Sequence, residues 1–212
     1  MFTGLIRHIG TLQARRQSGA GARLRVGAGP ELLARAEDGA SIAVMGACLT
    51  ALDRGADYFE ADLSLETLAK TTLGALPIGA ELNLEPSLLL GSPLDGHMVS
   101  GHVDALGALI DRPTFEGAWR FSVPKALLPM LAPKGSVAID GVSLTIAQAS
   151  GGSISVSLIP ETLRCTTLKN LRPGSQVNIE ADPIGRHVAH IMALNHASKT
   201  LEDFAENGWN RE

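Results

Sequence analysis

The chain contains only two cysteines, Cys48 and Cys165, among its 212 residues. That number is too small for the disulfide framework of a secreted domain and is typical of a protein in a reducing cytosol. No apolar run approaches the roughly 20 residues of a membrane helix, and the N-terminal MFTGLIRHIG lacks the long apolar core of a signal peptide. We therefore expect a cytoplasmic protein that does not bind a membrane.

An excess of positive charge is also missing. The formal charge is −4 and the pI is about 5.9, which gives no basic surface for nucleic acid. No glycine-rich phosphate loop of the Rossmann or P-loop type occurs in the sequence. The chain does contain 45% hydrophobic residues, which supports buried cores, and its length allows two domains of roughly 100 residues each.

One sequence is written twice in tandem. DLSLETLAKTTL at 62–73 returns as SLIPETLRCTTL at 157–168, with seven of twelve positions identical and an offset of 95 residues. The other matching segments are 40–50 with 135–145 and 79–85 with 174–180 at the same offset, and 1–10 with 98–107 at an offset of 97. A period this long predicts two small domains, each with its own core, and not a solenoid.

Both halves consist mostly of short segments that alternate in polarity or are rich in branched residues, with turn residues between them. Such segments are typical of β-strands and favour an antiparallel barrel or sandwich in each half. They include 23–29, 41–46, 58–64, 119–124, 136–141 and 153–160. Two stretches, 30–36 and 124–131, begin with a proline suited to a first helical turn, so we expect helices there.

A longer helix is expected at the C-terminal end. From Pro183 onward, apolar residues fall near helical spacing, which predicts an amphipathic helix over roughly 184–205. The first half has no counterpart. The residues alone leave two uses open, because such a helix could pack onto its own domain or assemble several chains.

The best-preserved part of the repeat places Thr67 and Thr162 beside Glu66 and Glu161. These residues could simply cap a helical turn. A capping role explains less well why this segment is preserved more than the rest. We favour a shared mode of ligand binding, with one polar molecule held by hydroxyl and backbone groups in each half.

The two halves differ at several chemically interesting positions. Cys48 aligns with Ser143, which argues for a polar, partly accessible site, although neither residue lies in a G-x-S-x-G hydrolase motif. His102 aligns with Leu5, and Asp182 aligns with Ser87. Two similar pockets with unequal reactive groups would suit a reaction between two copies of one molecule.

A metal site is not expected. His97 and His102 lie in DGHMVSGHVD, where the spacing fits no standard ligand pattern and the two cysteines add no cluster. His187 and His190 are ordinary surface residues of the expected helix.

Several motifs together resemble the riboflavin synthase family of the trimeric, alpha-chain type. They are MFTGLI at 1–6, GACLT at 46–50, LETL at 65–68, SGHVD at 100–104, DGVSLT at 140–145 and LIPETLRCTTL at 158–168. The resemblance implies an all-β fold of two tandem, homologous, six-stranded antiparallel Greek-key barrels with a C-terminal helix that drives trimerisation. It places a first lumazine-binding barrel at 1–96, a second at 97–183, and the helix and tail at 184–212.

The same resemblance implies the reaction. One molecule of 6,7-dimethyl-8-ribityllumazine transfers a four-carbon unit to a second in a dismutation, which gives riboflavin and 5-amino-6-(D-ribitylamino)uracil without a metal or an organic cofactor. The implied partners are this lumazine, riboflavin and two further copies of the chain, and an association with lumazine synthase stays open. The main rival is a relative that binds the lumazine or flavin without catalysis, like the lumazine proteins of luminous bacteria.

The resemblance also implies the site residues. Those expected around the reacting rings are Phe2, Ser41, Cys48, His102, Ser143, Thr145 and Asp182. The first barrel's ligand site is expected to use Gly4, Leu5 and Ile6, Cys48, Leu49 and Thr50, and Asp62, Leu63, Ser64, Leu65, Glu66 and Thr67. The second is expected to use Gly101, His102 and Val103, Lys134, Ser143, Leu144 and Thr145, and Ser157, Leu158, Ile159, Pro160, Glu161 and Thr162. In this chain Ala47 and Met45 stand where many members have cysteine and asparagine.

Overall fold

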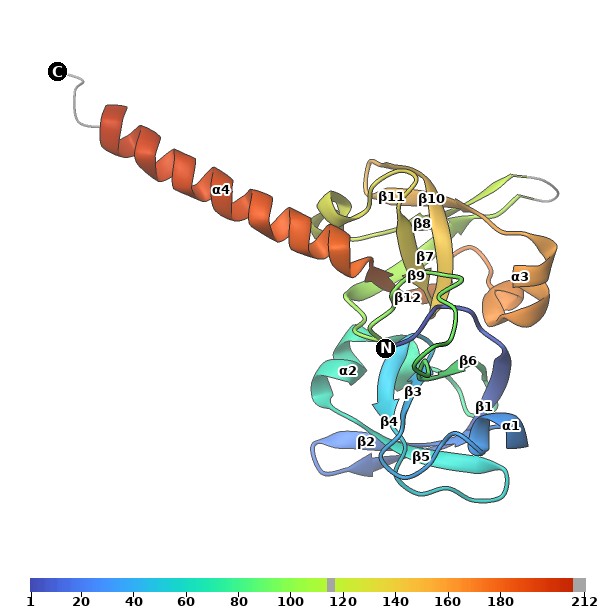
Figure 1. Ribbon diagram of the computed structural model, residues 1–212. Coiled ribbons are helices and arrows are strands. Elements are labelled where there is room, and N and C mark those ends of the chain that lie inside the picture. Colours follow the sequence, from blue (N-terminus) through green and yellow to red (C-terminus); the bar gives the residue numbers. More distant parts are fainter. Residues whose placement is uncertain (114–116, 208–212) are drawn as a thin grey trace.

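A computed structural model describes residues 1–113 and 117–207, with side chains described up to residue 195. The first half contains β1 (His8–Ser18), β2 (Gly21–Gly27), α1 (Pro30–Leu33), β3 (Ser41–Val44), β4 (Ala47–Thr50), β5 (Tyr58–Leu63), α2 (Leu65–Lys70), η1 (Thr72–Gly74) and β6 (Glu81–Pro86). The second half contains β7 (Ala105–Asp111), β8 (Ala118–Ser122), η2 (Lys125–Met130), β9 (Ser136–Ile139), β10 (Val142–Ser150), β11 (Ser153–Ser157), α3 (Pro160–Cys165), η3 (Thr167–Asn170), β12 (Gln176–Ala181) and α4 (Pro183–Asn207). The two halves lie one against the other, and α4 leaves the body from the second half (Figure 1).

Each half folds into a six-stranded antiparallel sheet with the same order of equivalent strands. In the first half the order is β4-β3-β6-β1-β2-β5, and in the second half the strands form a closed barrel in the order β10-β11-β8-β7-β12-β9. The mostly-β class, the duplication and the C-terminal helix expected from the sequence are therefore confirmed.

The two sheets differ in how they close. In the second half the single long strand β10 pairs with both β9 and β11. Its counterpart in the first half ends at Thr50 and is followed by LDRGAD at 52–57, whose Asp and Gly residues favour turns over strands. Three backbone hydrogen bonds still join this loop to β5, from Leu52 N–H to Glu60 O (2.9 Å), from Glu60 N–H to Asp53 O (2.6 Å) and from Gly55 N–H to Tyr58 O (2.8 Å).

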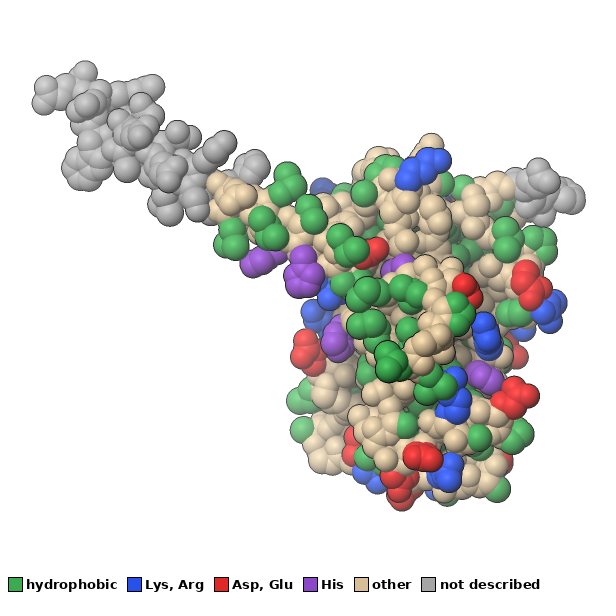
Figure 2. Space-filling model, viewed as in Figure 1, with side chains coloured by type: hydrophobic (Ala, Val, Ile, Leu, Met, Phe, Trp, Pro, Cys, Tyr) green, Lys and Arg blue, Asp and Glu red, His purple; other side chains and the backbone are tan. Residues whose placement is uncertain are grey.

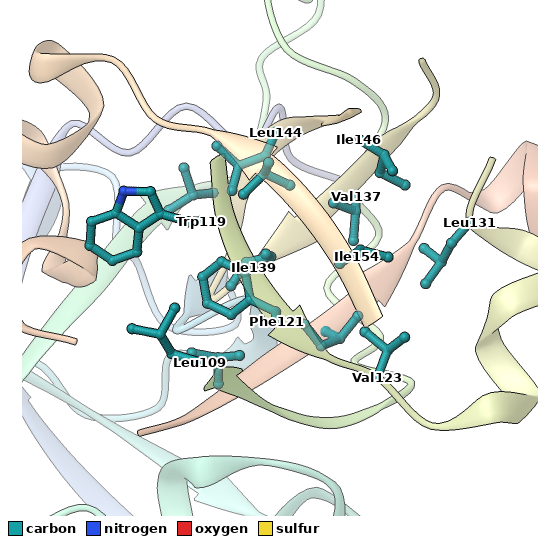
Figure 3. Packing of buried hydrophobic residues seen from close by; sticks show 14 of the residues in the cluster. Leu109, Trp119, Phe121, Val123, Leu131, Val137, Ile139, Leu144, Ile146 and Ile154 are labelled. Atoms are coloured by element: carbon teal, nitrogen blue, oxygen red, sulfur yellow. The ribbon is translucent and has the colours of Figure 1, made fainter. Parts of the chain in front are cut away.

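Each sheet encloses its own apolar core, because alternate side chains of every strand point inward. The second core gathers aromatic and branched side chains from all around the barrel, among them Leu109, Trp119, Phe121, Ile139 and Ile154 (Figure 3). The first core includes Leu24, Phe59 and Leu84, all fully buried.

The two proline-opened stretches are shorter or tighter than expected. α1 ends at Leu33 and so covers only the first turn of the predicted 30–36. The predicted helix at 124–131 is a 3-10 helix, η2, with Pro129 inside it. Proline has no N–H and its ring clashes with the preceding turn of an α-helix, which explains why a regular α-helix does not form there.

The helix α4 confirms the helix predicted over roughly 184–205, and it extends away from the body of the protein (Figure 1). Asp182 caps its start by accepting a hydrogen bond from Ile184 N–H (2.8 Å). An ion pair between Arg186 and Asp104 (2.9 Å) holds the first turn, and Gly185 allows the backbone to approach Met130 closely. Residues 208–212 of the expected tail lie outside the described residues.

A pseudo-twofold seam joins the two halves. Asn83 Nδ2 donates to the Asp140 carbonyl (2.9 Å), and the equivalent Asn178 Nδ2 donates to the Met45 carbonyl (2.8 Å). Met45 and Asp140 are themselves equivalent and both adopt a positive φ, 49° and 47°. The repeat therefore builds the interface between the halves as well as their interiors.

Candidate active site

The segment that precedes each barrel bridges to the opposite barrel. The carbonyl of Gly4 accepts a hydrogen bond from Ser143 N–H (2.8 Å), and Ile6 is part of the apolar core of the second barrel. In the equivalent contact, the carbonyl of Gly101 accepts from Cys48 N–H (2.8 Å), and Val103 packs against the first core. Each candidate site therefore contains residues from both halves.

The bridging segments, 4–6 and 101–103, each reach the opposite barrel at a crossing point, which is Gly4 against Ser143 in one case and Gly101 against Cys48 in the other. Glycine is required at both crossing points. Gly4 and Gly101 have φ values of 74° and 81°, which L-residues with a side chain rarely adopt. A Cβ atom at Gly4 would lie 2.6 Å from the Cβ of Ser143, and one at Gly101 would lie 2.5 Å from the Cβ of Cys48. The two glycines thus allow the bridging segments to contact the strands that carry the candidate reactive groups.

A buried glutamate from the last strand of each half holds the segment of its own half. Glu85 accepts hydrogen bonds from Thr3 N–H (2.7 Å), the Thr3 hydroxyl (2.7 Å) and Gly4 N–H (2.9 Å). Glu180 accepts the equivalent bonds from Ser100 and Gly101. Burial raises the pKa of Glu85, and the hydrogen bonds from Thr3 and Gly4 act in the opposite direction.

Phe2 and Val99 meet on the seam between the two segments. They exchange backbone hydrogen bonds of 2.8 and 3.1 Å, and both side chains are buried with Ala43 and Ala138, one from each half. Cys48 packs against the same cluster. Phe2 was expected beside the reacting rings, but its side chain has no exposed surface in this chain. It lies behind the site and supports it.

A cavity of about 250 Å³ lies at the crossing point in the first barrel. Its lining is Ala47, Cys48, Glu66, Thr67, Lys70, Thr71, Gly101, His102 and Val103. Cys48 is half-buried, whereas His102 is exposed and forms part of the wall. The cavity thus combines a thiol, an imidazole, hydroxyls and backbone groups, which suits the binding and proton handling of a polar ligand.

The assignment of the bridging segments from the sequence was wrong. Gly4–Ile6 were expected in the first barrel's site and Gly101–Val103 in the second, yet each lies against the other barrel. The reason is that the segment before each barrel is held at its N–H groups by its own half and presents its carbonyl to the other half. Cys48 is consequently grouped with His102 and not with Leu5.

The cap at the segment 64–67 comes from a different residue than expected. Ser64 Oγ accepts a hydrogen bond from Thr67 N–H (3.0 Å) and caps α2, so Thr67 supplies the capped N–H and not the capping side chain. Glu66 and Thr67 also line the cavity. In the second half Ile159 occupies the capping position without a side-chain bond, and Pro160 begins α3 instead.

Other predicted residues are engaged elsewhere. Asp62 forms a two-point ion pair with Arg23 (2.6 and 2.7 Å), whose guanidinium lowers the pKa of this carboxyl. Glu161 is bound by Arg164, which lowers its pKa to about 2. Four predicted ligand residues have side chains in the barrel cores, namely Ile6, Leu49, Leu63 and Leu144. Only backbone groups of these four could face a ligand.

Four further candidates, Ser41, Lys134, Thr145 and Asp182, lie on strands or in the segments that flank them. Ser41 pairs with Thr50, and Thr145 pairs with the equivalent Ser136. Lys134 has a φ of 69° and donates its N–H to Ile146 O (2.8 Å). Asp182 lies at the start of α4, where it contributes to the electrostatic environment of His97.

Sequence reasoning missed two groups of residues at the sites. Lys70 and Thr71 line the first cavity. Lys70 ends α2 three residues after Thr67, and Thr71 follows it as the C-terminal cap, so their spacing from Thr67 was the available signal. His97 was considered only as a metal ligand, yet its Nδ1 lies 2.7 Å from Ser143 Oγ. Among the described residues there is no group of three or more His, Cys, Asp or Glu side chains arranged to hold a metal ion.

No helix in the described part of the chain combines the length and hydropathy of a membrane span.

Comparison with known proteins found one family model and a set of relatives that share one name. The family model described as lumazine binding domain matches twice, at residues 3–87 and 100–182. Proteins named riboflavin synthase are 40% identical over 91% of this chain in Mycobacterium bovis, 36% over 92% in Photobacterium phosphoreum and 33% over 99% in Bacillus subtilis. The alignments cover 98%, 90% and 100% of these relatives.

Solved structures of LumP have the same fold. The complex of LumP with riboflavin superposes with a TM-score of 0.78 at 23% identity, covering 85% of this chain and 99% of that one. The complex with 6,7-dimethyl-8-(1'-D-ribityl) lumazine gives a TM-score of 0.76 at 24% identity.

Proposed function

The chain belongs to the riboflavin synthase family, and from this premise we propose that its two unequal sites bind two lumazine molecules and catalyse their dismutation. A four-carbon unit passes from one 6,7-dimethyl-8-ribityllumazine to the other, which yields riboflavin and 5-amino-6-(D-ribitylamino)uracil. The C7 methyl of the lumazine is acidic because its carbanion is delocalised into the ring. The protein therefore has to orient two flat rings and move protons, and orientation supplies much of the acceleration.

The observation that carries this proposal is the pair of equivalent crossing points with different reactive groups. One has Cys48 with His102, and the other has Ser143 with His97. A ligand of one kind can thus bind twice in similar surroundings and meet different acid–base chemistry. We divide the chain into barrels at 1–96 and 97–183 and a helix with its tail at 184–212.

The direct test is incubation of the purified protein with the lumazine alone, followed by flavin absorbance. We expect riboflavin to form without added metal or nucleotide, with one riboflavin for every two lumazines consumed. Activity that a chelator abolishes and zinc restores would contradict the metal-free reaction. Tight binding of the lumazine without any conversion would instead identify a binding protein of the LumP kind.

We also propose that the chain assembles as a cytoplasmic homotrimer through α4. Ile184, Val188 and Ile191 of this helix are 67%, 51% and 57% exposed. Apolar side chains lie along the surface of its described part (Figure 2). Exposed apolar side chains on a helix that leaves the body are typical of an assembly surface. Each active site would then combine the first barrel of one chain with the second barrel of its neighbour.

A mixing experiment tests this arrangement. Cys48→Ala and Ser143→Ala should each lower turnover, and co-refolding the two variants should restore part of it. The reason is that a mixed trimer contains an interface that pairs an unaltered Cys48 with an unaltered Ser143. Ser143 is preferable to Asp182 as the second position, because Asp182 also caps α4. A monomeric mass, or mixtures no more active than the separate variants, would contradict the arrangement.

A further inference from the structure

We propose that His97 is a positioning residue for Ser143, and that it fixes the serine hydroxyl as a hydrogen-bond donor toward the ligand of the second site. This inference rests on the proposed function, since it assigns a task to Ser143 in the reaction. It adds His97, a residue that was not among those expected at the sites.

The contact between the two side chains is short and well supported. His97 Nδ1 lies 2.7 Å from Ser143 Oγ, and His97 is only 8% exposed. The backbone N–H of His97 donates to Thr3 O (3.2 Å), which fixes the chain at this point. A Cβ atom at Gly96 would lie 2.1 Å from that same carbonyl and 3.2 Å from Ser143 Oγ, so glycine is needed for the approach.

The other ring nitrogen decides which tautomer is present. Nε2 of His97 is buried and has no hydrogen-bond partner among the described residues. A buried N–H without a partner is rarer and costlier than a buried acceptor without one. The proton of the neutral ring therefore lies on Nδ1, from which it is donated to Ser143 Oγ. Burial lowers the pKa of His97, with Asp182 opposing the shift, and this favours the neutral ring.

The direction of this bond determines what Ser143 can do. Since Oγ accepts the proton of His97, the serine's own hydroxyl proton is directed elsewhere. Ser143 is half-buried on β10 and lies against Gly4, at the crossing point of the second barrel. A ligand seated there would receive the proton of Ser143 as a hydrogen bond, which stabilises negative charge that develops on its ring.

The first site has a different group at the position equivalent to Ser143, because Cys48 stands there. A thiol is a weak hydrogen-bond donor. The two sites therefore differ in how strongly they polarise the bound ring, and the second site provides the stronger donor.

The test measures kcat and KM for lumazine conversion by the full-length chain carrying His97→Leu, His97→Asn, Ser143→Ala or the double change His97→Leu with Ser143→Ala. We expect His97→Leu to lower kcat about tenfold with little change in KM, which corresponds to about 1.4 kcal/mol. His97→Asn should restore much of the loss, because its amide can donate from the position of Nδ1. In the Ser143→Ala background, His97→Leu should lower kcat no further.

A matched control separates positioning from general destabilisation. Leu131 is a buried core residue, 2% exposed, of the same barrel. We expect the effects of Leu131→Ala and Ser143→Ala on the logarithm of kcat to be additive. Additive effects of His97→Leu and Ser143→Ala, or failure of His97→Asn to restore kcat, would overturn the role of His97. An unaltered chain that binds lumazine without converting it would refute the proposed function instead.

Discussion

Phe2→Ala is expected to destabilise the chain by about 3–5 kcal/mol and to lower turnover by about 100-fold. The Phe2 side chain has no exposed surface and fills the seam between Ala43 of the first half and Ala138 of the second. Removing it leaves a cavity directly behind both bridging segments. Gly4 and Gly101 would then lose the support that holds their carbonyls against Ser143 and Cys48.

Urea unfolding together with steady-state rates measures both effects. Phe121→Ala provides the control, because Phe121 is as fully buried but lies only in the second core (Figure 3). We expect similar losses of stability from the two changes and a much larger loss of turnover from Phe2→Ala. Equal turnover of the two variants under conditions where both are folded would show that Phe2 contributes only to stability.

Asp140→Asn is expected to stabilise the chain at pH 8 by about 4 kcal/mol and to leave its stability at pH 4 nearly unchanged. Asp140 is 1% exposed, and burial raises the pKa of its carboxyl from 3.8 to about 7. The raised pKa means that the folded state favours the protonated acid. Stability linked to this group is therefore complete below about pH 4 and is lost as the pH rises through 7.

Asparagine matches aspartate in shape and keeps the contacts that Asp140 makes as an acceptor. It cannot ionise, its carbonyl can accept the Asn178 N–H bond that Asp140 accepts at 2.8 Å, and it tolerates the φ of 47°. The measurement is urea unfolding of both proteins from pH 4 to pH 8, with the exposed Asp38→Asn as control. A stability difference that does not change with pH would show that Asp140 does not titrate in this range.

The fold could be predicted from the sequence because both halves of the repeat contain the same residues at positions where the backbone has to turn. Glycine after Met45 and after Asp140 marks the same tight turn, and TTL in both halves marks the same 3-10 turn, η1 and η3. Closure of the first sheet was less predictable. It depends on whether the strand after Cys48 continues, and the Asp-Arg-Gly run at 53–55 ends it.

The composition of each site could not be predicted from the same information. A repeat identifies Gly4 with Gly101 and Cys48 with Ser143, but it does not say which glycine meets which partner. That choice depends on Glu85 and Glu180, which hold the segments on the seam so that their carbonyls face the opposite half. A buried glutamate at the same point of each last strand was the signal, and only the structure showed what it binds.

The central claim, that each site is completed by the opposite half, is tested most directly by riboflavin protection of Cys48 from alkylation. The measurement uses Cys165→Ser as background, so that Cys48 is the only thiol, and compares Gly101→Ala with Gly4→Ala. A Cβ at Gly101 would lie 2.5 Å from the Cβ of Cys48, whereas Gly4 meets Ser143. The account predicts that Gly101→Ala abolishes protection and Gly4→Ala preserves it. Loss of protection in Gly4→Ala with full protection in Gly101→Ala would contradict it.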